Sequence, residues 1–381
     1  MSDSSSAGRR SRLLRRALLL GLVALLLFEL AIRWLLFAAP SAMAAVGARL
    51  QHAELFAAPW EDDYWKLRYL FRDAARAHRP PSHPLLGWHT AEVDPDDLEH
   101  RAHGALAGRR PILLYGDSFA ACVTPAAECW QGLIEASPYG MSFALLNYGT
   151  GGYGLDQTYL MARESLPRYL PERPLVVIGI LIDDDLDRTG LRMRGWPKPY
   201  LVPAADGGLQ LDEPVAPDEE HFLGEHPLSI RSFAWRYLLC GSGLLPAWLE
   251  NRFTGRREAL ERTRYCSRLI LEALAQELRA SGSEHFVILF HGPPASGSPL
   301  GRRQHAGWRE SFLVRELERL GLPYVLSSVE LAASGEPGLF VEDASARRGH
   351  YTAAGNRAVF GTLVRGIEGQ FDTTERSASA R

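Results

Sequence analysis

Five short apolar runs, separated by helical patterns, set the strongest limit on how this chain can fold. They are PILLY, FALLN, PLVVIGIL, HFVILF and PYVLS, at residues 111–115, 143–147, 174–181, 285–290 and 323–327. Their apolar character is continuous rather than alternating, which is typical of strands buried on both faces of a parallel sheet. Helical patterns occupy the segments 155–169, 255–281 and 303–320. We expect a three-layer α/β/α sandwich with a flavodoxin-like five-stranded parallel sheet in the order 2-1-3-4-5, because right-handed crossovers from a central first strand give that order.

An arginine-rich segment followed by a long apolar stretch opens the chain. RRSRLLRR, at residues 9–16, carries five arginines, and residues 17–39 are apolar except for Glu29 and Arg33. A stretch of about 20 apolar residues spans a bilayer, and two opposite charges four residues apart on a helix can pair. We predict a single-pass membrane anchor that leaves the arginines in the cytoplasm and the rest of the chain in the periplasm or outside the cell. The alternative is a signal peptide cleaved at Ala42-Met43-Ala44.

Composition limits the partners and cofactors. With 42 basic and 45 acidic residues, the net charge of -3 gives no electrostatic case for nucleic-acid binding. The four cysteines either form up to two disulfides or stay as buried thiols, and the pairs nearest in sequence are Cys122 with Cys129 and Cys240 with Cys266. No C-x-x-C pair is present, and the spacings of the histidines at 78, 83, 89, 100 and 103 fit no common ligand pattern. We therefore expect neither a metal nor a cofactor.

The sequence GDSFAAC, residues 116–122, follows the first apolar run. Strand, tight turn and helix in succession place the Ser118 hydroxyl at the carboxyl edge of the sheet, where open α/β folds bind ligands. Ser118 is either a nucleophile or a residue that caps the helix. A nucleophilic serine needs a base and fixed oxyanion donors. Two later strand ends offer them: NYGTGGYGLDQ at residues 147–157, and RRGHYTAAGNRAVF, which contains His350.

These three blocks, in this order, resemble those of the GDSL or SGNH hydrolase superfamily, in particular its bacterial membrane-anchored members. The resemblance covers about residues 80–370. It implies that Ser118 is the nucleophile and His350 the base. It also implies that the Ser118 and Gly152 amides belong to an oxyanion hole, since Gly152 follows Asn147 at the five-residue spacing of the family's second block.

Two blocks depart from the family pattern. The third block normally carries an asparagine that donates to the oxyanion, but GILIDDDLDR at residues 179–188 has none, and Asp183 or Asp184 falls near that place. An ionised carboxylate would repel a developing oxyanion. Either the hole rests on the two amides, or an aspartate is held protonated, or this acidic segment only caps the next helix.

The second departure concerns the acid that orients the histidine. The family places an aspartate three residues before the histidine, where this chain has Arg347. We favour Asp343 as the orienting acid; a Ser-His dyad, or a triad completed by one of the aspartates 183–185, is the alternative. His291, in LFHGPP after the fourth strand, is expected to line the cleft, together with Asp117 and Asn147 as candidate substrate-binding residues.

The function predicted from these residues is that of an extracytoplasmic serine ester hydrolase. It would act through an acyl-enzyme on Ser118, on O-acyl esters of carbohydrate or lipid. One alternative is an O-acyltransferase that modifies an exported polysaccharide, and another is a catalytically silent carbohydrate-binding module. The predicted organisation has five parts. They are a cytoplasmic basic segment (1–16), a transmembrane anchor (17–39), a juxtamembrane region (40–105), a hydrolase-like domain with an insertion at about 188–250 (106–370), and a disordered tail (371–381).

Overall fold

The computed structural model describes residues 4–38, 44–71, 80–243, 246–293, 307–343 and 347–379. The chain divides into two compact units, which are described separately below. The N-terminal unit comprises Met1–His78 and Glu219–Ala259, and the sheet unit comprises Arg79–Asp218 and Leu260–Arg381. Ala42 and Met43 of the possible cleavage site, and residues 303–306 at the start of a predicted helix, lie outside the described residues.

The sheet unit contains the predicted parallel sheet. Its strands are β3 (Arg110–Tyr115), β4 (Phe143–Asn147), β5 (Leu175–Leu181), β10 (Glu284–Phe290) and β11 (Tyr324–Leu326). They lie in the order β4-β3-β5-β10-β11, and every neighbouring pair is parallel. Numbered along the chain, this order is 2-1-3-4-5, so the predicted fold class and strand order are confirmed. The continuous apolar pattern has the expected cause, since all residues of β5 are buried.

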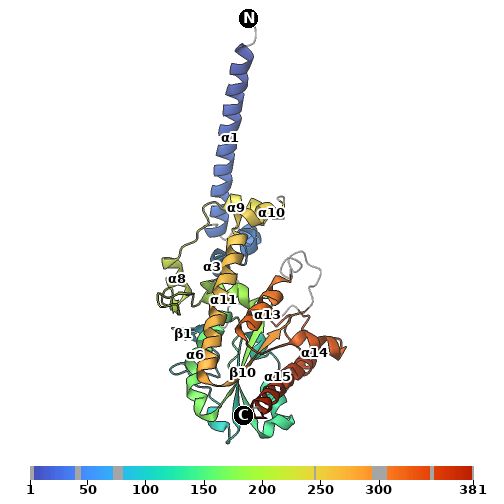
Figure 1. Cartoon of the computed structure of the whole chain (residues 1–381). Helices are drawn as coiled ribbons and strands as arrows, with labels where there is room; N and C mark the ends of the chain where they lie inside the picture. Colours follow the sequence, from blue (N-terminus) through green and yellow to red (C-terminus); the bar gives the residue numbers. More distant parts are fainter. Residues whose placement is uncertain are drawn as a thin grey trace. The chain divides into compact units, whose positions relative to one another are not determined.

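Helices cover both faces of this sheet (Figure 1). The first face packs against α6 (Leu155–Ser165), α11 (Arg256–Ser281) and α13 (Trp308–Leu320), and the second against α5 (Trp130–Glu135) and α15 (Ala353–Ser379). Within β3, Leu113 and Tyr115 join the first core, whereas Ile112 and Leu114 join the second. Alternate side chains of one buried strand therefore serve two apolar cores.

The remaining elements of the sheet unit are short. They are the helices α4 (Ser118–Ala121), α7 (Asp185–Thr189) and α14 (Ser327–Ser334), and the antiparallel pairs β1 (Ser82–His83) with β2 (Gly87–Trp88), β6 (Met193–Arg194) with β7 (Trp196–Pro197), and β8 (Leu201–Pro203) with β9 (Leu209–Leu211). The insertion predicted at about 188–250 is shared between the units, because the chain passes into the N-terminal unit at Glu219. Helix α15 continues to Ser379, so residues 371–379, for which the sequence predicted disorder, are helical. Residues 380 and 381 lie outside the described part.

The N-terminal unit is helical. Its helices are α1 (Ser4–Phe37), α2 (Ala44–Leu50), α3 (Asp62–Leu70), α8 (Glu219–Glu225), α9 (Phe233–Cys240) and α10 (Ala247–Phe253). Within α1, Arg15–Phe37 is long and apolar enough to cross a membrane, with a mean hydropathy of 2.2. A small apolar core includes Ile32 and Leu36 from α1 and Phe56 and Phe233 from the rest of the unit.

One of the two cysteine pairs that are nearest in sequence is bonded. Cys122 and Cys129 form a disulfide, whereas Cys240 and Cys266 are thiols. The bonded pair begins at the residue that directly follows α4. This disulfide therefore closes the loop that leaves the GDSF turn.

Candidate active site

The GDSF turn connects β3 to α4 at the carboxyl edge of the sheet. Asp117 precedes the helix, and its Oδ1 accepts a hydrogen bond from the Phe119 amide at 2.8 Å. The helix cap is therefore Asp117, and Ser118 is the first residue of α4. The helix-cap interpretation of Ser118 is wrong, because the residue before it performs that role.

Ser118 lies in hydrogen-bond contact with His350, as predicted from the sequence. His350 Nε2 is 2.8 Å from Ser118 Oγ, although the two residues are 232 positions apart. The ring also stacks on Phe119, with centroids 5.1 Å apart and planes 27° from parallel. A serine hydroxyl and an imidazole at this distance have the geometry of a nucleophile and its general base.

The other ring nitrogen of His350 is held by the main chain. His350 Nδ1 lies 2.8 Å from the Arg347 carbonyl oxygen, which also accepts from the His350 amide at 3.0 Å. Gly349, between them, has φ +83°, a conformation that favours glycine. Because a carbonyl oxygen only accepts, Nδ1 carries the proton, and the Nε2 lone pair faces the Ser118 hydroxyl.

The loop after β4 packs closely against α4. The Asn147 side chain donates to the Ala120 carbonyl at 3.0 Å and accepts from the Gly149 amide at 2.9 Å. A Cβ at Gly149 would lie 2.1 Å from the Ala121 amide nitrogen, so only glycine permits this approach. In this structure Asn147 therefore ties the second block to the nucleophile turn. Its predicted contact with substrate stays a prediction.

The two amides expected to bind an oxyanion are available. Neither the Ser118 nor the Gly152 N–H has a hydrogen-bond partner among the residues that the structure describes. A Cβ at Gly152 would lie 3.3 Å from Arg194 Nη1 and 3.5 Å from the Trp88 ring. A guanidinium therefore borders the loop that carries the Gly152 amide.

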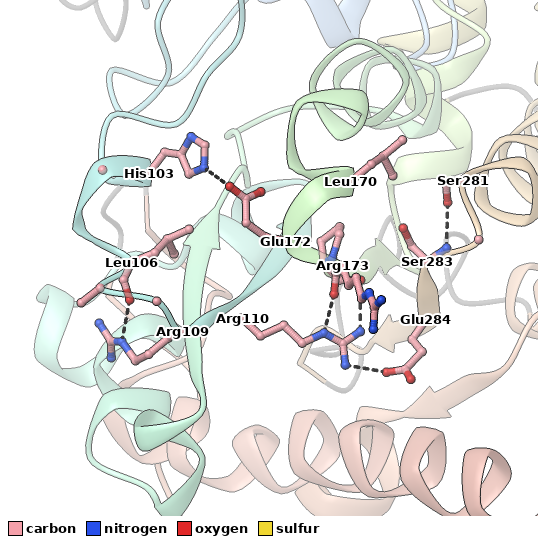
Figure 2. Close-up of a pocket in the computed structure, with 15 residues that line it drawn as sticks. His103, Leu106, Arg109, Arg110, Leu170, Glu172, Arg173, Ser281, Ser283 and Glu284 are labelled. Atoms are coloured by element: carbon pink, nitrogen blue, oxygen red, sulfur yellow. Dashed lines mark hydrogen bonds and ion pairs between the residues drawn. The ribbon is translucent and has the colours of Figure 1, made fainter. Parts of the chain in front are cut away.

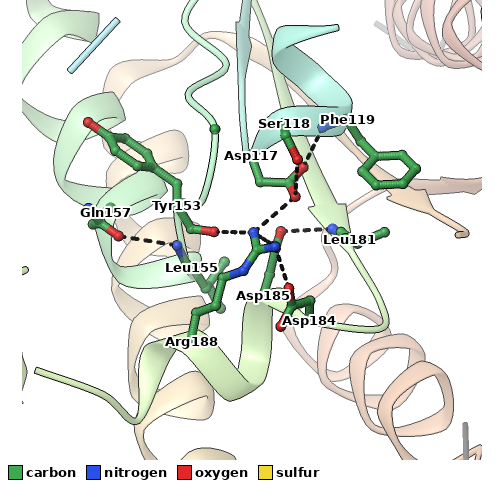
Figure 3. Close-up of polar contacts among 12 residues, drawn as sticks. Asp117, Ser118, Phe119, Tyr153, Leu155, Gln157, Leu181, Asp184, Asp185 and Arg188 are labelled. Carbon is green, nitrogen blue, oxygen red and sulfur yellow. Dashed lines mark hydrogen bonds and ion pairs between the residues drawn. The ribbon is translucent and has the colours of Figure 1, made fainter. Parts of the chain in front are cut away.

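A buried ionic network around Arg188 supports the GDSF turn (Figure 3). Arg188 Nη1 donates to Asp117 Oδ2 at 3.0 Å, to Asp185 Oδ1 at 2.9 Å and to the Tyr153 carbonyl at 2.7 Å. Its Nη2 donates to Asp184 Oδ2 at 2.5 Å, and only 6% of the Arg188 side chain is exposed. One guanidinium therefore joins the GDSF turn, the second block and the start of α7.

Two carboxylates of this network have pKa values shifted in opposite directions. Loss of water opposes ionisation of Asp184, but the guanidiniums of Arg188 and Arg194 outweigh it and hold the Asp184 pKa below its usual range. Burial and the neighbouring Asp117 carboxylate raise the pKa of Asp185, despite its bond to Arg188. Asp184 Oδ2 binds both arginines, since Arg194 Nη2 donates to the oxygen that accepts from Arg188, at 2.8 Å.

Comparisons with known proteins identify no family for the chain. The sequence matches no protein-family model and no curated protein. The structure is similar to TesA, at a TM-score of 0.36 and 15% identity over 68% of this chain and 99% of that one. It is also similar to the lipase/acylhydrolase from Enterococcus faecalis, at a TM-score of 0.35 and 18% identity over 68% of this chain and 96% of that one. A third similar structure is the acetylxylan esterase Axe2 from Geobacillus stearothermophilus, at a TM-score of 0.37 and 13% identity over 68% of this chain and 94% of that one. At such scores the likeness carries no argument about activity, which therefore rests on the site itself.

His291 and Asp183 lie on loops at the same edge. His291 Nδ1 is 3.1 Å from Ser327 Oγ, and burial lowers the pKa of the ring below its usual value. A Cβ at the next residue, Gly292, would lie 2.9 Å from Asp183 Oδ2. Pro293 packs against the position that a Cβ of Gly349 would take, at 3.6 Å. The loop after β10 therefore borders the turn that holds His350, while the predicted oxyanion role of Asp183 stays a prediction.

Among the residues that the structure describes, no hydrogen bond joins Asp343 to the His350 ring. Asp343 is exposed, and the hydrogen bonds of the His350 ring among the described residues go to Ser118 and to the Arg347 carbonyl. Its assignment as the orienting acid therefore stays a prediction. Within the described part of the chain, no three His, Cys, Asp or Glu side chains are placed to hold a metal ion.

Sequence reasoning missed Arg188 and Arg194. Both lie in or just after the acidic third block, which was considered only for its carboxylates. A signal was present, because four aspartates within residues 183–187 need cations if they are buried. Nothing in the sequence indicated which arginine would approach the GDSF turn.

Proposed function

We propose that this chain is a serine ester hydrolase of the SGNH type, anchored in a membrane with its sheet unit outside the cytoplasm. The observation that carries the proposal is the 2.8 Å contact of His350 Nε2 with Ser118 Oγ at the carboxyl edge of the sheet. The fixed Nδ1–H of His350 and the two available amides supply the remaining parts of an acyl-transfer site. A silent binding module would not need a base aimed at a hydroxyl.

The chemistry follows from these positions. Ser118 Oγ attacks the ester carbonyl while His350 Nε2 takes its proton, which gives a tetrahedral intermediate. The intermediate collapses as the imidazolium returns that proton to the leaving alcohol, and an acyl-Ser118 ester remains. A water molecule then attacks this ester and loses a proton to Nε2. The second tetrahedral intermediate collapses as the imidazolium returns that proton to Ser118 Oγ, which releases the carboxylic acid and restores free Ser118.

We infer that Arg194 takes the place of the missing asparagine in the oxyanion hole. The Ser118 and Gly152 amides donate to the oxyanion, and Arg194 Nη1 lies 3.3 Å from the position that a Cβ of Gly152 would take. A guanidinium always carries charge and donates several N–H groups, so it stabilises negative charge that develops on the carbonyl oxygen. The ionised Asp184 holds Arg194 in place at 2.8 Å. This arrangement explains how an acidic third block is compatible with hydrolysis.

The substrate class and compartment follow from other features. The α1 span and the arginines before it favour a chain whose sheet unit faces the periplasm or the exterior. The disulfide at the exit of α4 agrees with an oxidising compartment. The esters available there are O-acyl groups on carbohydrate or lipid, and we propose these as substrates.

Active-site labelling tests the proposal. The purified full-length protein is treated with a fluorophosphonate, which phosphonylates an activated serine, and the adduct is located by mass spectrometry. We expect a single adduct on Ser118 and none in Ser118→Ala. Release of free acid from a short acyl ester, with no sugar acceptor present, then identifies a hydrolase rather than a transferase. An adduct on another serine, or no adduct, would contradict the proposal.

A further inference from the structure

The transmembrane helix α1 is covered by protein over its last part only. Every side chain from Arg15 to Phe28 is exposed, and coverage begins at Glu29. Beyond it, Ile32 and Leu36 are each 3% exposed and belong to the core of the N-terminal unit. The bare apolar part is therefore the twelve residues 17–28.

Twelve helical residues are too short to cross a bilayer. At about 1.5 Å per residue they rise about 18 Å, whereas the hydrocarbon core is about 30 Å thick. Residues 29–37 add about 13 Å at the same rise, which completes the span. If α1 crosses the membrane, as the proposed function requires, its protein-covered part must lie within the lipid as well.

Glu29 fixes α9 at this depth. Its carboxylate accepts from Ser232 Oγ at 2.8 Å and from the first amides of α9, Phe233 N at 3.1 Å and Ala234 N at 2.9 Å. Arg33 Nε donates to the same carboxylate at 2.5 Å. These bonds satisfy an acidic group inside a membrane segment, and they use the amides that a helix start leaves unpaired. The start of α9 thus lies level with Glu29, inside the span.

The surface of α9 and α10 suits that position. Trp235, Trp248 and Phe253, here called the aromatic collar, are 44%, 63% and 52% exposed. Trp235 and Phe253 contact each other edge to face, with ring centroids 5.7 Å apart, so the two helices present one aromatic surface. Trp and other large aromatic side chains are enriched where a protein meets the membrane–water interface. Arg252, exposed in the last turn of α10, is placed to meet lipid headgroups.

We propose that the aromatic collar inserts into the outer leaflet of the bilayer around the end of α1. The segment Glu219–Ala259, which belongs to the N-terminal unit, is then a second, monotopic membrane contact of this chain. The proposal commits to lipid as the occupant, because the length of bare helix and the position of Glu29 place these residues within the lipid. It rests on α1 spanning the membrane, which the test below checks separately.

Depth-dependent quenching tests the collar. Full-length protein with Cys240→Ser and Cys266→Ser carries one new cysteine, labelled with bimane, at Trp248→Cys or, as a second probe, at Trp235→Cys. Each is reconstituted into phosphatidylcholine–phosphatidylglycerol vesicles with nitroxide lipids, and iodide is the aqueous quencher. Leu22→Cys, within the bare part of α1, is the positive control. Met141→Cys, an exposed position of the sheet unit at 87%, is the water-exposed control.

We expect the collar probes to be quenched by nitroxide lipids at least half as strongly as the probe at position 22, and protected from iodide relative to position 141. Quenching at 22 but full iodide access at 235 and 248 would overturn the collar and leave the anchor intact. Protection of both probes from both quenchers would mean that a second copy covers the aromatic collar, and it would also overturn the proposal. Absence of lipid quenching at position 22 would instead remove the spanning helix on which the inference rests.

Discussion

The two edges of the parallel sheet differ in how their polar groups are used. At the amino edge, where β3, β5 and β10 begin, charged side chains line a cavity of about 940 Å³ (Figure 2). These groups bind one another: Arg110 pairs with Glu284 at 2.8 Å, and His103 lies between Glu99 and Glu172 at 2.7 and 3.1 Å.

At the carboxyl edge, where we propose the active site, the polar groups are not all paired with one another in this way. His350 presents a lone pair to the Ser118 hydroxyl, and the Ser118 and Gly152 amides have no partner among the described residues. A large cavity does not by itself mark the edge at which we propose the active site. The carboxyl edge differs in having two amides, of Ser118 and Gly152, that have no hydrogen-bond partner among the described residues.

The largest expected effect comes from removing the reactive pair. Ser118→Ala and His350→Ala should each reduce hydrolysis of a short acyl ester by about 10³-fold or more, because the nucleophile or its base is lost. Both side chains are partly exposed, so thermal unfolding should change little. His103→Gln, a histidine change at the amino edge, should leave the rate unchanged. A similar loss of hydrolysis in His103→Gln would contradict the distinction between the two edges of the sheet.

Removal of Arg188 should mainly reduce stability. Arg188→Met leaves buried carboxylates without their cation, and breaking such a network costs about 3–5 kcal/mol. Arg168→Met is the matched control near the amino edge, where an exposed pair with Asp97 contributes about 1 kcal/mol or less. Urea unfolding of the purified protein in detergent measures both. Equal losses of unfolding free energy in the two variants would mean that the ionic network at the carboxyl edge stabilises the protein no more than the pair at the amino edge.

Arg194 should affect the rate more than substrate binding. Arg194→Ala should lower kcat by about 10–100-fold with little change in KM, because the lost donor acts on charge that develops in the transition state. Arg194→Lys should recover part of kcat, since it keeps the charge but not the planar donor set. A rise in KM at constant kcat would show that Arg194 binds substrate without stabilising the oxyanion.

A smaller effect is expected at Asp343. Asp343→Asn should lower kcat by less than about tenfold, because the His350 Nδ1–H already has an acceptor in the Arg347 carbonyl. Steady-state hydrolysis at saturating ester is the measurement. A loss as large as that of His350→Ala would indicate that the loop rearranges in the reacting enzyme and brings the carboxylate to the ring.

The amino edge should respond to pH through stability alone. Burial opposes protonation of His103, but the Glu99 and Glu172 carboxylates outweigh it and raise the His103 pKa. Its contribution is therefore complete below about pH 6.5, the value expected in the unfolded chain, and is lost as pH rises through the higher folded pKa. The stability difference between wild type and His103→Gln should shrink from pH 6 to 9. A difference that grows with pH would contradict this assignment.

The sheet could be predicted from sequence because a strand that is buried on both faces is a continuous apolar run. The runs 143–147 and 285–290 needed no long-range information, and the strand order followed from crossover handedness. Ser118 could be placed at the carboxyl edge because it directly follows the turn after β3, whereas His350 lies beyond β11 and α14, and its pairing with Ser118 was predicted from the resemblance of its block to the family pattern.

What escaped prediction depends on side-chain direction or on tertiary fit. Arg188 reaches the GDSF turn, and Arg194 reaches the loop of Gly152, through rotamers and a hairpin that no local pattern encodes. The transfer of Glu219–Ala259 to the N-terminal unit follows from its packing with α1, which joins residues 204 positions apart. The partner of His350 Nδ1 is a main-chain oxygen, and residue types cannot indicate such an acceptor because every residue carries a carbonyl.

That main-chain acceptor changes which mutations the active site tolerates. Every amino acid at position 347 supplies the same carbonyl, so the base would keep its orientation through most substitutions there. The constraint moves instead to Gly349, whose φ of +83° other residues rarely adopt. A saturation library selected for hydrolysis should therefore accept many residues at 347 and few besides glycine, or asparagine, at 349. The group that orients His350 would then be marked in the sequence by a glycine that sets the backbone conformation, rather than by an acidic residue.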